Sequence, residues 1–337
     1  MFKRAIFLIP VFCLLFVFFS CKEKKSKTVD EDITLVMAEV NPPDSVIGLM
    51  DQAFKRKVED LSAGKIKIDL QCSGILGDEK QIMALIMQPH SSIQIVRGPA
   101  NLSSYSGGKP VKSSLISIPY TFKNDDHFWR FANSEIAQEM LDEPYQLGLG
   151  VKGLFYAQEG LRHFISTEKI QSVSDLKNKK MRVSGNTLTA LCQAFQSDPI
   201  NIKFTELYAG FQTGRIEVAE QPLSNYLSNS LNYVAPYMIL DGHMLGAVSV
   251  MINASCWDSL SDRQKNILIT AGKYSSLYCH KILDEKNAET IQQLKKKSAT
   301  IIEVKDQKSW QDACSQMRKE AASIDPQLYQ KILDLAD

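Results

Sequence analysis

The side chains that most often carry chemistry are present in this chain, but never in a catalytic spacing. No HExxH, GxSxG or GxGxxG pattern occurs. Gly107-Gly108-Lys109 lacks the preceding glycine of a phosphate-binding loop and continues into Pro110, which indicates a turn. Asp125-Asp126-His127 precedes an aromatic-rich helix and indicates its N-cap rather than a metal site. We therefore predict no enzyme, no cofactor and no metal, since paired ligand spacing is also missing among His90, His127, His163, His243 and His280.

The cysteines indicate structure rather than chemistry. Once Cys13 and Cys21 are set aside, an odd number with wide spacing remains, which fits neither a disulfide framework nor a zinc site. Buried free thiols are the favoured state, with one bridge as the alternative, for Cys72, Cys192, Cys256, Cys279 and Cys314.

Arg182, on the predicted strand 180–184, has a side chain suited to binding an anion. An arginine that projects from a strand edge into a cleft offers a planar fork of donors that matches a carboxylate. Such a bidentate contact is stronger and more directional than one made by lysine. The alternative is that Arg182 and the upstream Arg162 are surface residues or structural salt-bridge partners.

Predicted strands and helices alternate along the chain, and these elements must position the residues above. Such alternation implies a parallel sheet with helices on its faces. No Pro/Gly-rich linker divides the chain into sequential halves, and this fits two lobes that exchange segments through crossing strands. One long helical pattern, 261–297, places Ile267, Ala271, Tyr274, Tyr278 and Ile282 on one face. The other predicted helices are 46–61, 77–87, 134–147, 173–176, 188–196, 205–213 and two at the end of the chain, and the predicted strands are 33–40, 66–71, 93–96, 151–156, 180–184, 200–203, 247–252 and 300–304.

The first residues predict the compartment. Lys3 and Arg4 precede an apolar run to Phe19 that is too short to span a bilayer and suits a secretory signal. The run ends at Ser20-Cys21, similar to a bacterial lipobox in which Cys21 takes a lipid; an ordinary cleaved signal is the alternative. The segment 22–32 is charged and nearly free of apolar residues, so we interpret it as a flexible tether.

Composition bounds the class of protein. The 44% hydrophobic and 23% charged residues are typical of a soluble globule, and the length after the tether predicts two domains. The formal charge of +1 falls to about −1 when Lys3 and Arg4 leave with the signal. Neither nucleic acid nor an anionic membrane surface is favoured as a partner.

Several stretches, in this order, resemble the DctP family of solute receptors of TRAP transporters, over about residues 33 to 290. Each stretch is weak alone, and the retained order and spacing make the resemblance specific. The matching stretches are Pro43-Asp44-Ser45, 61–68 (LSAGKIKI), 73–79 (SGILGDE), 118–122 (IPYTF), 160–164 (GLRHF), 175–183 (DLKNKKMRV), 204–208 (FTELY) and 253–260 (NASCWDSL).

The resemblance implies a two-lobe, periplasmic-binding-protein-like α/β fold, with mixed sheets flanked by helices and a long helix bridging both lobes. It places Arg182 on the carboxylate of the ligand, with Arg162 assisting as in some members. It places Phe204 against the body of the ligand and Glu39 near it, with a core phenylalanine and a solvated strand end as the alternatives. His243, near the lobe-crossing segment, is expected to be structural.

The chain departs from the family pattern beside the anchoring arginine. Gln221 stands where the family has an asparagine that bonds the same carboxylate, so its amide reaches from one methylene further out. The stretch 87–93 loses an aspartate and gains Pro89, and Ser184 replaces a proline. We therefore expect the ligand to be an organic acid whose part beyond the carboxylate is unusual. Our hypothesis is that this part is largely apolar.

The expected function is that of an extracytoplasmic receptor that binds an organic acid between its lobes and delivers it to TRAP permease subunits in the membrane. Some relatives also work with an accessory tetratricopeptide-repeat protein. The rival interpretations are a structural surface lipoprotein that keeps the fold but not the pocket, and an ABC-type binding protein. The expected division is 33–157 plus about 248–285 for lobe I, and 158–247 plus about 286–337 for lobe II.

Overall fold

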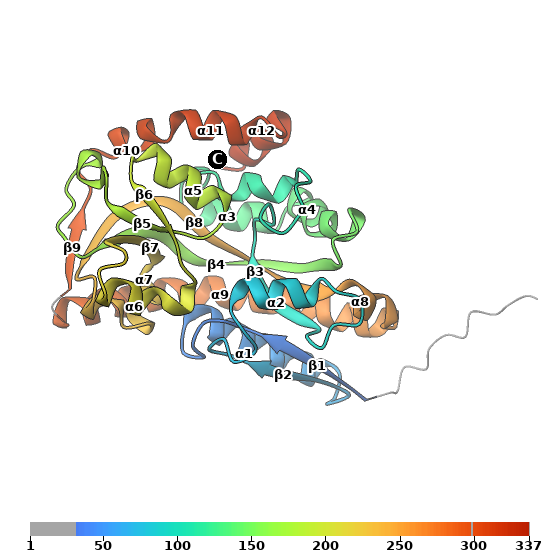
Figure 1. Ribbon diagram of the computed structural model, residues 1–337. Coiled ribbons are helices and arrows are strands. Elements are labelled where there is room, and N and C mark those ends of the chain that lie inside the picture. Colours follow the sequence, from blue (N-terminus) through green and yellow to red (C-terminus); the bar gives the residue numbers. More distant parts are fainter. Residues whose placement is uncertain (1–31, 298, 337) are drawn as a thin grey trace, which may run out of the picture.

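The computed structural model describes residues 32–297 and 299–336. The predicted segments 1–21 and 22–32, including Cys21, therefore lie outside the described residues except for Asp32. Nine strands of the described chain form one sheet (Figure 1). They are β1 (Ile33–Ala38), β2 (Ile66–Gln71), β3 (Ile95–Pro99), β4 (Val151–Ser166), β5 (Lys180–Val183), β6 (Asp198–Asn201), β7 (Val218–Pro222), β8 (Tyr237–Asn253) and β9 (Thr300–Glu303).

Helices cover the sheet and carry its connections (Figure 1). The α-helices are α1 (Val46–Leu61), α2 (Glu79–Ile86), α3 (Asp125–Ala132), α4 (Glu135–Gln146), α5 (Asn186–Ala194), α6 (Leu207–Gln212), α7 (Leu223–Ser228), α8 (Ala254–Ser259), α9 (Asp262–Lys296), α10 (Gln307–Ala313), α11 (Ser315–Ala322) and α12 (Pro326–Asp334). Short 3-10 turns are η1 (Lys112–Ser117), η2 (Val173–Leu176), η3 (Phe204–Glu206) and η4 (Leu231–Tyr233).

The long strands β4 and β8 join the two lobes. The strand order is β2-β1-β3-β8-β4-β7-β5-β6, with β9 also pairing with β8. The first half of β4 and the last half of β8 pair with each other beside β3, while the last residues of β4 pair with β7. Parallel pairs flank this antiparallel centre, so the sheet is mixed as predicted. The crossing strands expected from the missing linker are therefore present.

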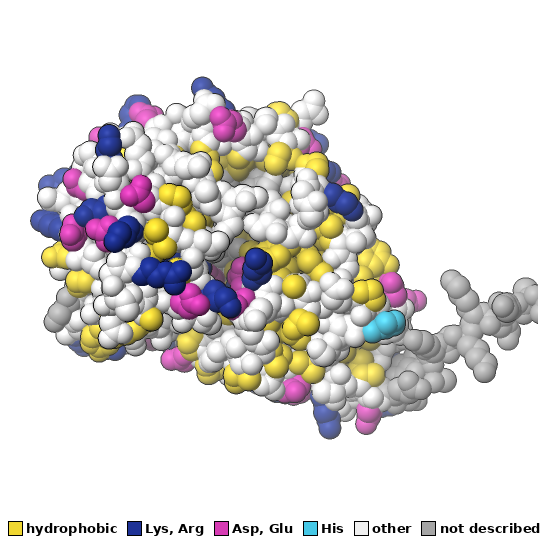
Figure 2. All heavy atoms as spheres, viewed as in Figure 1, with side chains coloured by type: hydrophobic (Ala, Val, Ile, Leu, Met, Phe, Trp, Pro, Cys, Tyr) yellow, Lys and Arg dark blue, Asp and Glu magenta, His cyan; other side chains and the backbone are white. Residues whose placement is uncertain are grey.

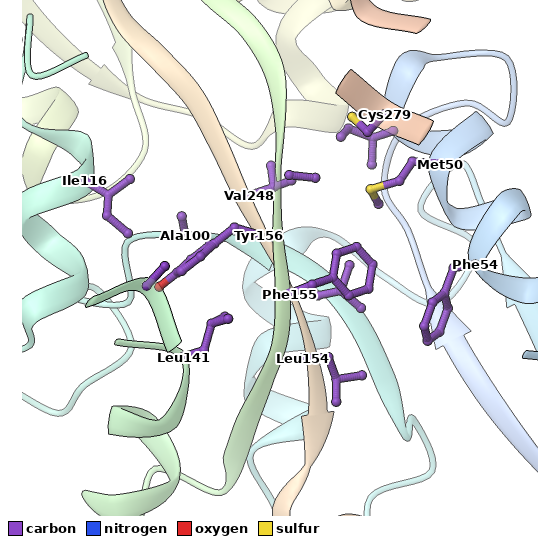
Figure 3. Packing of buried hydrophobic residues seen from close by; sticks show 14 of the residues in the cluster. Met50, Phe54, Ala100, Ile116, Leu141, Leu154, Phe155, Tyr156, Val248 and Cys279 are labelled. Carbon is purple, nitrogen blue, oxygen red and sulfur yellow. The ribbon is translucent and has the colours of Figure 1, made fainter. Parts of the chain in front are cut away.

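The core follows from strand alternation, because successive side chains of a strand point to opposite faces. Phe155 and Tyr156 of β4 show this directly (Figure 3). Phe155 faces Phe54 of α1, with ring centroids 5.5 Å apart, and Tyr156 points to the other side, toward Leu141 of α4. The sheet thus divides the buried side chains of lobe I into two layers of one core.

The long helix α9 spans both lobes, where it contacts α1 and β4 at one end and α7 and β9 at the other. It begins with a capping box between Ser261 and Gln264. The predicted apolar face is partly wrong, since Tyr274 is 45% exposed. Small residues face the sheet instead, and a Cβ on Gly272 would lie 2.5 Å from Cδ1 of Phe155. Close packing of α9 on β4 leaves no room for an aromatic ring.

Other differences from the sequence predictions have local causes. The strand β7 was not predicted, because Glu220 and Gln221 interrupt its apolar pattern although both are buried. The N-cap of α3 is Asn124, so Asp125 opens the helix rather than capping it. Three helices rather than two close the chain. Within 286–337, Trp310 packs in a cluster of lobe II, whereas Tyr329 and Ile332 pack in the core of lobe I.

Candidate ligand-binding site

The two lobes meet along a crevice bridged by polar contacts. Lys203, which follows β6, forms an ion pair of 2.6 Å with Asp78, the N-cap of α2. The amide of Asn101 donates to the hydroxyl of Thr187 at 3.0 Å. Phe204, the residue after Lys203, packs against apolar clusters of both lobes. The lobes are therefore closed on each other.

A groove of about 300 Å³ opens at this junction. Figure 2 shows this face of the molecule hollowed near its centre, with basic and acidic side chains around the hollow. Both lobes supply its walls, so the groove exists as a unit only while they are in contact. Its lining residues are Val40, Pro42, Ser73, Phe204, Thr205, Leu207, Tyr208, Asn229 and Leu231.

Arg182 lies on β5, is not among the residues that line this groove, and is 6% exposed. Its Nε donates to the carbonyl of Ile202 at 3.3 Å, and the following residue, Lys203, takes part in the interlobe ion pair. Among the described residues no carboxylate forms an ion pair with Arg182. Burial lowers the pKa of Arg182; the charge of Glu220 opposes this shift and that of Arg162 adds to it. Arg182 is thus a buried cation without a carboxylate partner in the described chain.

Gln221 projects from the same face of the sheet as Arg182. Met181 and Val183 of β5 share one apolar cluster with Val218 of β7, whereas Ala219 belongs to the other cluster. Met181 pairs with Val218, so strand alternation puts Arg182, Ala219 and Gln221 on one face. Gln221 is 1% exposed, and neither atom of its amide has a hydrogen-bond partner in the described chain. A buried amide without partners costs free energy unless a ligand or water satisfies it.

Arg162, by contrast, is neutralised within the protein. Its Nη2 donates to Glu220 at 2.8 Å, its Nε donates to the second oxygen of the same carboxylate, and its Nη1 donates to Glu159 at 3.3 Å. Burial would raise the pKa of Glu220, but the charge of Arg162 and the hydrogen bonds of His243 and Arg162 lower it to about 2. Arg162 is thus held between Glu220 and Glu159 of the protein.

His243 extends this ionic network into lobe II. Its Nδ1 lies 2.6 Å from Asp241 and its Nε2 lies 3.8 Å from Glu220. Burial alone would lower the pKa of His243, but these two carboxylates raise it to about 9. The imidazole stacks on Phe164 with centroids 4.5 Å apart. His243 is therefore a buried, structural cation.

Glu39 is also ion-paired within the protein, and its partner is a residue that was not predicted from the sequence. Arg97 of β3 donates from Nε and Nη2 to the two oxygens of Glu39 at 2.7 and 2.5 Å. Both side chains are buried. Burial and the charge of Glu39 raise the pKa of the adjacent, fully buried Asp51 well above its ordinary value. The signal that could have revealed Arg97 is a charged residue inside the apolar stretch Ile95 to Pro99.

No cluster of histidine, cysteine or acidic residues in the described part of the chain could hold a metal ion. The five described cysteines are unbridged, and Cys192, Cys279 and Cys314 are buried as predicted, whereas Cys72 and Cys256 are half-buried. None of the described helices combines the length and apolar character needed to cross a bilayer. Cys21 lies outside the described residues, so its lipidation stays a prediction.

The fold and this crevice define a two-lobed solute-binding protein. The family model of DctP, described as bacterial extracellular solute-binding protein, family 7, matches residues 37–324. The chain belongs to this family, whose members are extracytoplasmic solute receptors and not enzymes. The resemblance on which the sequence analysis relied is thereby confirmed, and the receptor function is favoured over a structural lipoprotein.

Curated relatives are similar along most of the chain. A C4-dicarboxylate-binding periplasmic protein DctP of Shewanella loihica is 24% identical over 306 residues, covering 89% of this chain and 87% of that protein. The 2,3-diketo-L-gulonate-binding periplasmic protein YiaO of Escherichia coli is 22% identical over 262 residues, covering 77% and 78%.

Solved structures share the fold. A TRAP periplasmic solute-binding protein of Pseudomonas putida F1 with bound D-glucuronate superposes with a TM-score of 0.83 at 24% identity, covering 89% of this chain and 96% of that one. The sugar acid-binding protein DctPAm of Advenella mimigardefordensis, in complex with galactonate, gives a TM-score of 0.84 at 21% identity, covering 91% and 98%. The predicted two-lobe α/β architecture is therefore confirmed.

Proposed function

We propose that this protein captures a small organic acid between its two lobes and presents it to TRAP permease subunits in the membrane. The observation that carries the proposal is Arg182, a buried guanidinium with no carboxylate partner among the described residues. An unpaired buried charge costs several kcal/mol, roughly, and is kept only where a partner arrives. A carboxylate of the solute supplies that partner in bidentate geometry.

Gln221 and Phe204 complete the proposed contacts. Gln221 lies on the face of Arg182 and has an unsatisfied amide, so it bonds a carboxylate or hydroxyl oxygen of the same solute. Phe204 lines the groove and packs against the body of the solute. Arg162 and Glu39 are each held in bidentate ion pairs, and we assign them to the framework around the site rather than to direct contact.

The names of relatives support this class of ligand. The Shewanella relative is a C4-dicarboxylate-binding protein, and the Pseudomonas structure holds D-glucuronate. Both ligands are carboxylates. These two relatives are only 24% identical to the chain, so their ligands do not identify its solute. The residues of this chain determine which acid it binds.

Closure is the proposed mechanism. We assign 33–157 with about 248–285 to lobe I and 158–247 with about 286–337 to lobe II, except that α12 packs in the core of lobe I; β4, β8 and α9 join the two lobes. The solute shifts the population toward the closed form, in which Phe204 touches both lobes. Removal of water strengthens the ion pair with Arg182. The permease recognises the closed form.

The N-terminal segment supplies the location. Cys21 takes the lipid anchor and 22–32 serves as the tether, which holds the receptor at the membrane on its extracytoplasmic side. An accessory tetratricopeptide-repeat protein, a partner in some relatives, is a further proposed partner.

A thermal-shift screen of the purified receptor, from residue 22 onward, against a library of organic acids tests the proposal. A ligand at one hundred times its Kd stabilises the folded state by about 2.7 kcal/mol, which raises Tm by several degrees. We expect at least one carboxylate to do so for the wild-type protein and none to do so for Arg182→Lys. A shift that survives in Arg182→Lys, or a solute without any acidic group, would overturn the proposal.

A further inference from the structure

Glu159 and Asn41 contact each other where the first lobe meets the crossing strands. Glu159 lies on β4, in the part where the pairing of β4 with β8 shifts register, and Asn41 follows β1 of lobe I. The amide Nδ2 of Asn41 donates to Oε1 of Glu159 at 3.3 Å. Val40 and Pro42, on either side of Asn41, line the interlobe groove. The contact therefore ties one wall of the groove to a strand that joins the lobes.

Both side chains of this contact are enclosed, since Glu159 is 4% and Asn41 is 2% exposed. Gly246 of β8 leaves room for the carboxylate, because a Cβ on this glycine would lie 3.2 Å from Cβ and 3.5 Å from Oε2 of Glu159. Lobe I and both crossing strands thus supply the surroundings of Glu159. Opening of the lobes admits water to its carboxylate, and closure removes that water.

The two arginines nearest to Glu159 are each committed to another acid. Arg97 donates to both oxygens of Glu39, and Arg162 donates to both oxygens of Glu220. Glu159 accepts Nη1 of Arg162 at 3.3 Å, a longer contact than the 2.8 Å between Nη2 of Arg162 and Glu220. Three carboxylates thus share two guanidinium groups, and Glu159 has the weakest share of positive charge.

The surroundings of Glu159 favour its neutral form. Burial raises the pKa of Glu159 and the charge of Glu39 adds to this rise, while the charges of Arg97 and Arg162 and the side chain of Asn225 on α7 oppose it. Further titratable groups act on this cluster from α1, α2, α9 and β8. They are Asp51 beside Glu39, Glu79 acting on Arg97 and Arg162, Cys279 facing Glu159, and His243, which is paired with Asp241 and lies 3.8 Å from Glu220.

The amide oxygen of Asn41 is an acceptor without a donor. Oδ1 is buried and has no hydrogen-bond partner in the described chain, which costs free energy. The donation from Nδ2 to Glu159 fixes which end of the amide faces the carboxylate. A neutral carboxyl has one O–H donor. A carboxyl and a primary amide that face each other form two hydrogen bonds, N–H to the acid oxygen and O–H to the amide oxygen. A proton on Glu159 therefore satisfies Oδ1 of Asn41.

We infer that closure of the lobes on a solute is linked to the uptake of one proton from water by Glu159, whose neutral carboxyl donates to Oδ1 of Asn41. The inference rests on the proposed function and adds regulation by pH to the same site. In the open form water solvates Glu159 and the group is ionised. Closure removes this water, and the solute brings a further carboxylate into the crevice, so the proton offsets the added charge. Low pH therefore favours capture, and high pH favours release.

Calorimetric titration in two buffers of different ionisation enthalpy, phosphate and Tris, counts the protons taken up per solute bound. The probes are D-glucuronate, galactonate and erythronate, whose carboxyl groups are ionised throughout the range of about pH 6 to 8. We expect the wild-type protein to take up roughly half to one proton near neutral pH, and its Kd to rise with pH by up to about tenfold per pH unit.

Glu159→Gln identifies the group, because glutamine has the shape and the hydrogen-bond donor of the neutral carboxyl but does not titrate. We expect this variant to take up no proton and its Kd to stay level with pH. The control is Glu139→Gln on an exposed residue of α4, which should behave as the wild type. Solute binding without proton uptake, or equal uptake in Glu159→Gln, overturns the inference and leaves the proposed function standing. If neither these probes nor any acid of the thermal-shift library binds, both fall.

Infrared difference spectra, solute-saturated minus solute-free, test the role of Asn41. The wild-type protein should gain the band of a neutral carboxyl when the solute binds, and Glu159→Gln should lack this band. Asn41→Ala removes the acceptor, so the band should move to higher frequency, as for a carboxyl that loses a hydrogen bond. A band that persists in Glu159→Gln would place the proton on another acid, and a band unmoved in Asn41→Ala would contradict the bond to Oδ1.

Discussion

Lys203 of lobe II and Asp78 of lobe I form an ion pair of 2.6 Å across the crevice, directly before Phe204. Asp78 is fixed by its second task, because it caps α2 and forms a capping box with Gln81. The carboxylate is 8% exposed, whereas the side chain of Lys203 is 53% exposed. The lysine is therefore the mobile half of a contact that forms only when the lobes close.

Lys203→Met is expected to shift the receptor toward the open form without unfolding either lobe. Since the lysine is exposed, the effect should be small, about threefold to fivefold in solute affinity, and should shrink at high salt. Small-angle scattering and calorimetry measure the two quantities. Lys308→Met, which removes an exposed ion pair with Asp312 away from the crevice, is the control. Equal effects of the two variants would show that Lys203 does not act on closure.

Replacement of the two arginines by glutamine should have opposite effects on stability. Arg162→Gln leaves Glu220 buried without its partner, which should cost about 3–5 kcal/mol in the free energy of unfolding. Arg182→Gln removes a buried cation that has no acid partner in the described chain, so the solute-free protein should keep or gain stability. Urea denaturation in the absence of solute measures both. A loss in Arg182→Gln as large as that in Arg162→Gln would reveal a partner for Arg182.

Two buried histidines predict a stability maximum close to neutral pH. The pKa of His243 is raised from 6.5 to about 9, so its contribution is complete below pH 6.5 and is lost as pH rises toward 9. Burial lowers the pKa of His163 from 6.5 to about 4, so its contribution is present above pH 6.5 and is lost as pH falls toward 4. Each histidine should change the free energy of unfolding by roughly 3 kcal/mol across its pH range.

Unfolding midpoints measured across pH check this prediction. His243→Gln should lower stability overall and flatten the alkaline limb, while the exposed His90→Gln should leave the profile unchanged. A wild-type profile that stays level from about pH 6.5 to 9 would contradict the charged state assigned to His243.

Gly272→Ala tests the close packing of α9 on β4. Alanine favours a helix over glycine by about 1 kcal/mol. A Cβ here would nevertheless lie 2.5 Å from Cδ1 of the buried Phe155, which should outweigh that gain and cost about 1–3 kcal/mol. Urea denaturation measures the change, and Lys273→Ala on the exposed side should stay within about 0.5 kcal/mol. A more stable Gly272→Ala variant would show that α9 and β4 can adjust to accommodate an added methyl group.

Much of the fold was predictable because its local signals agree with its tertiary structure. The helix α1 and the strand β2 have the predicted bounds, since capping by Ser45 and the turn after Leu61 leave little choice. The lengths of β4 and β8 were not predictable from apolar runs, because their centres carry Glu159, Arg162 and His243. Those charges are buried only through partners distant in the sequence.

The candidate site was likewise predictable only in part. The type of Arg182 and its strand were sufficient to nominate it, since an arginine fork has few alternatives for binding a carboxylate. Sequence could not show that Arg162 and Glu39 are occupied, because their partners Glu220 and Arg97 lie 58 residues away.

The most direct test of the account is a crystal structure of the receptor with the acid that the thermal-shift screen selects. We predict that both carboxylate oxygens of the solute lie about 3 Å from the guanidinium nitrogens of Arg182, with Arg162 still bound to Glu220. A solute carboxylate held elsewhere, while Arg182 remains unpaired or turns to a protein acid, would contradict the central claim.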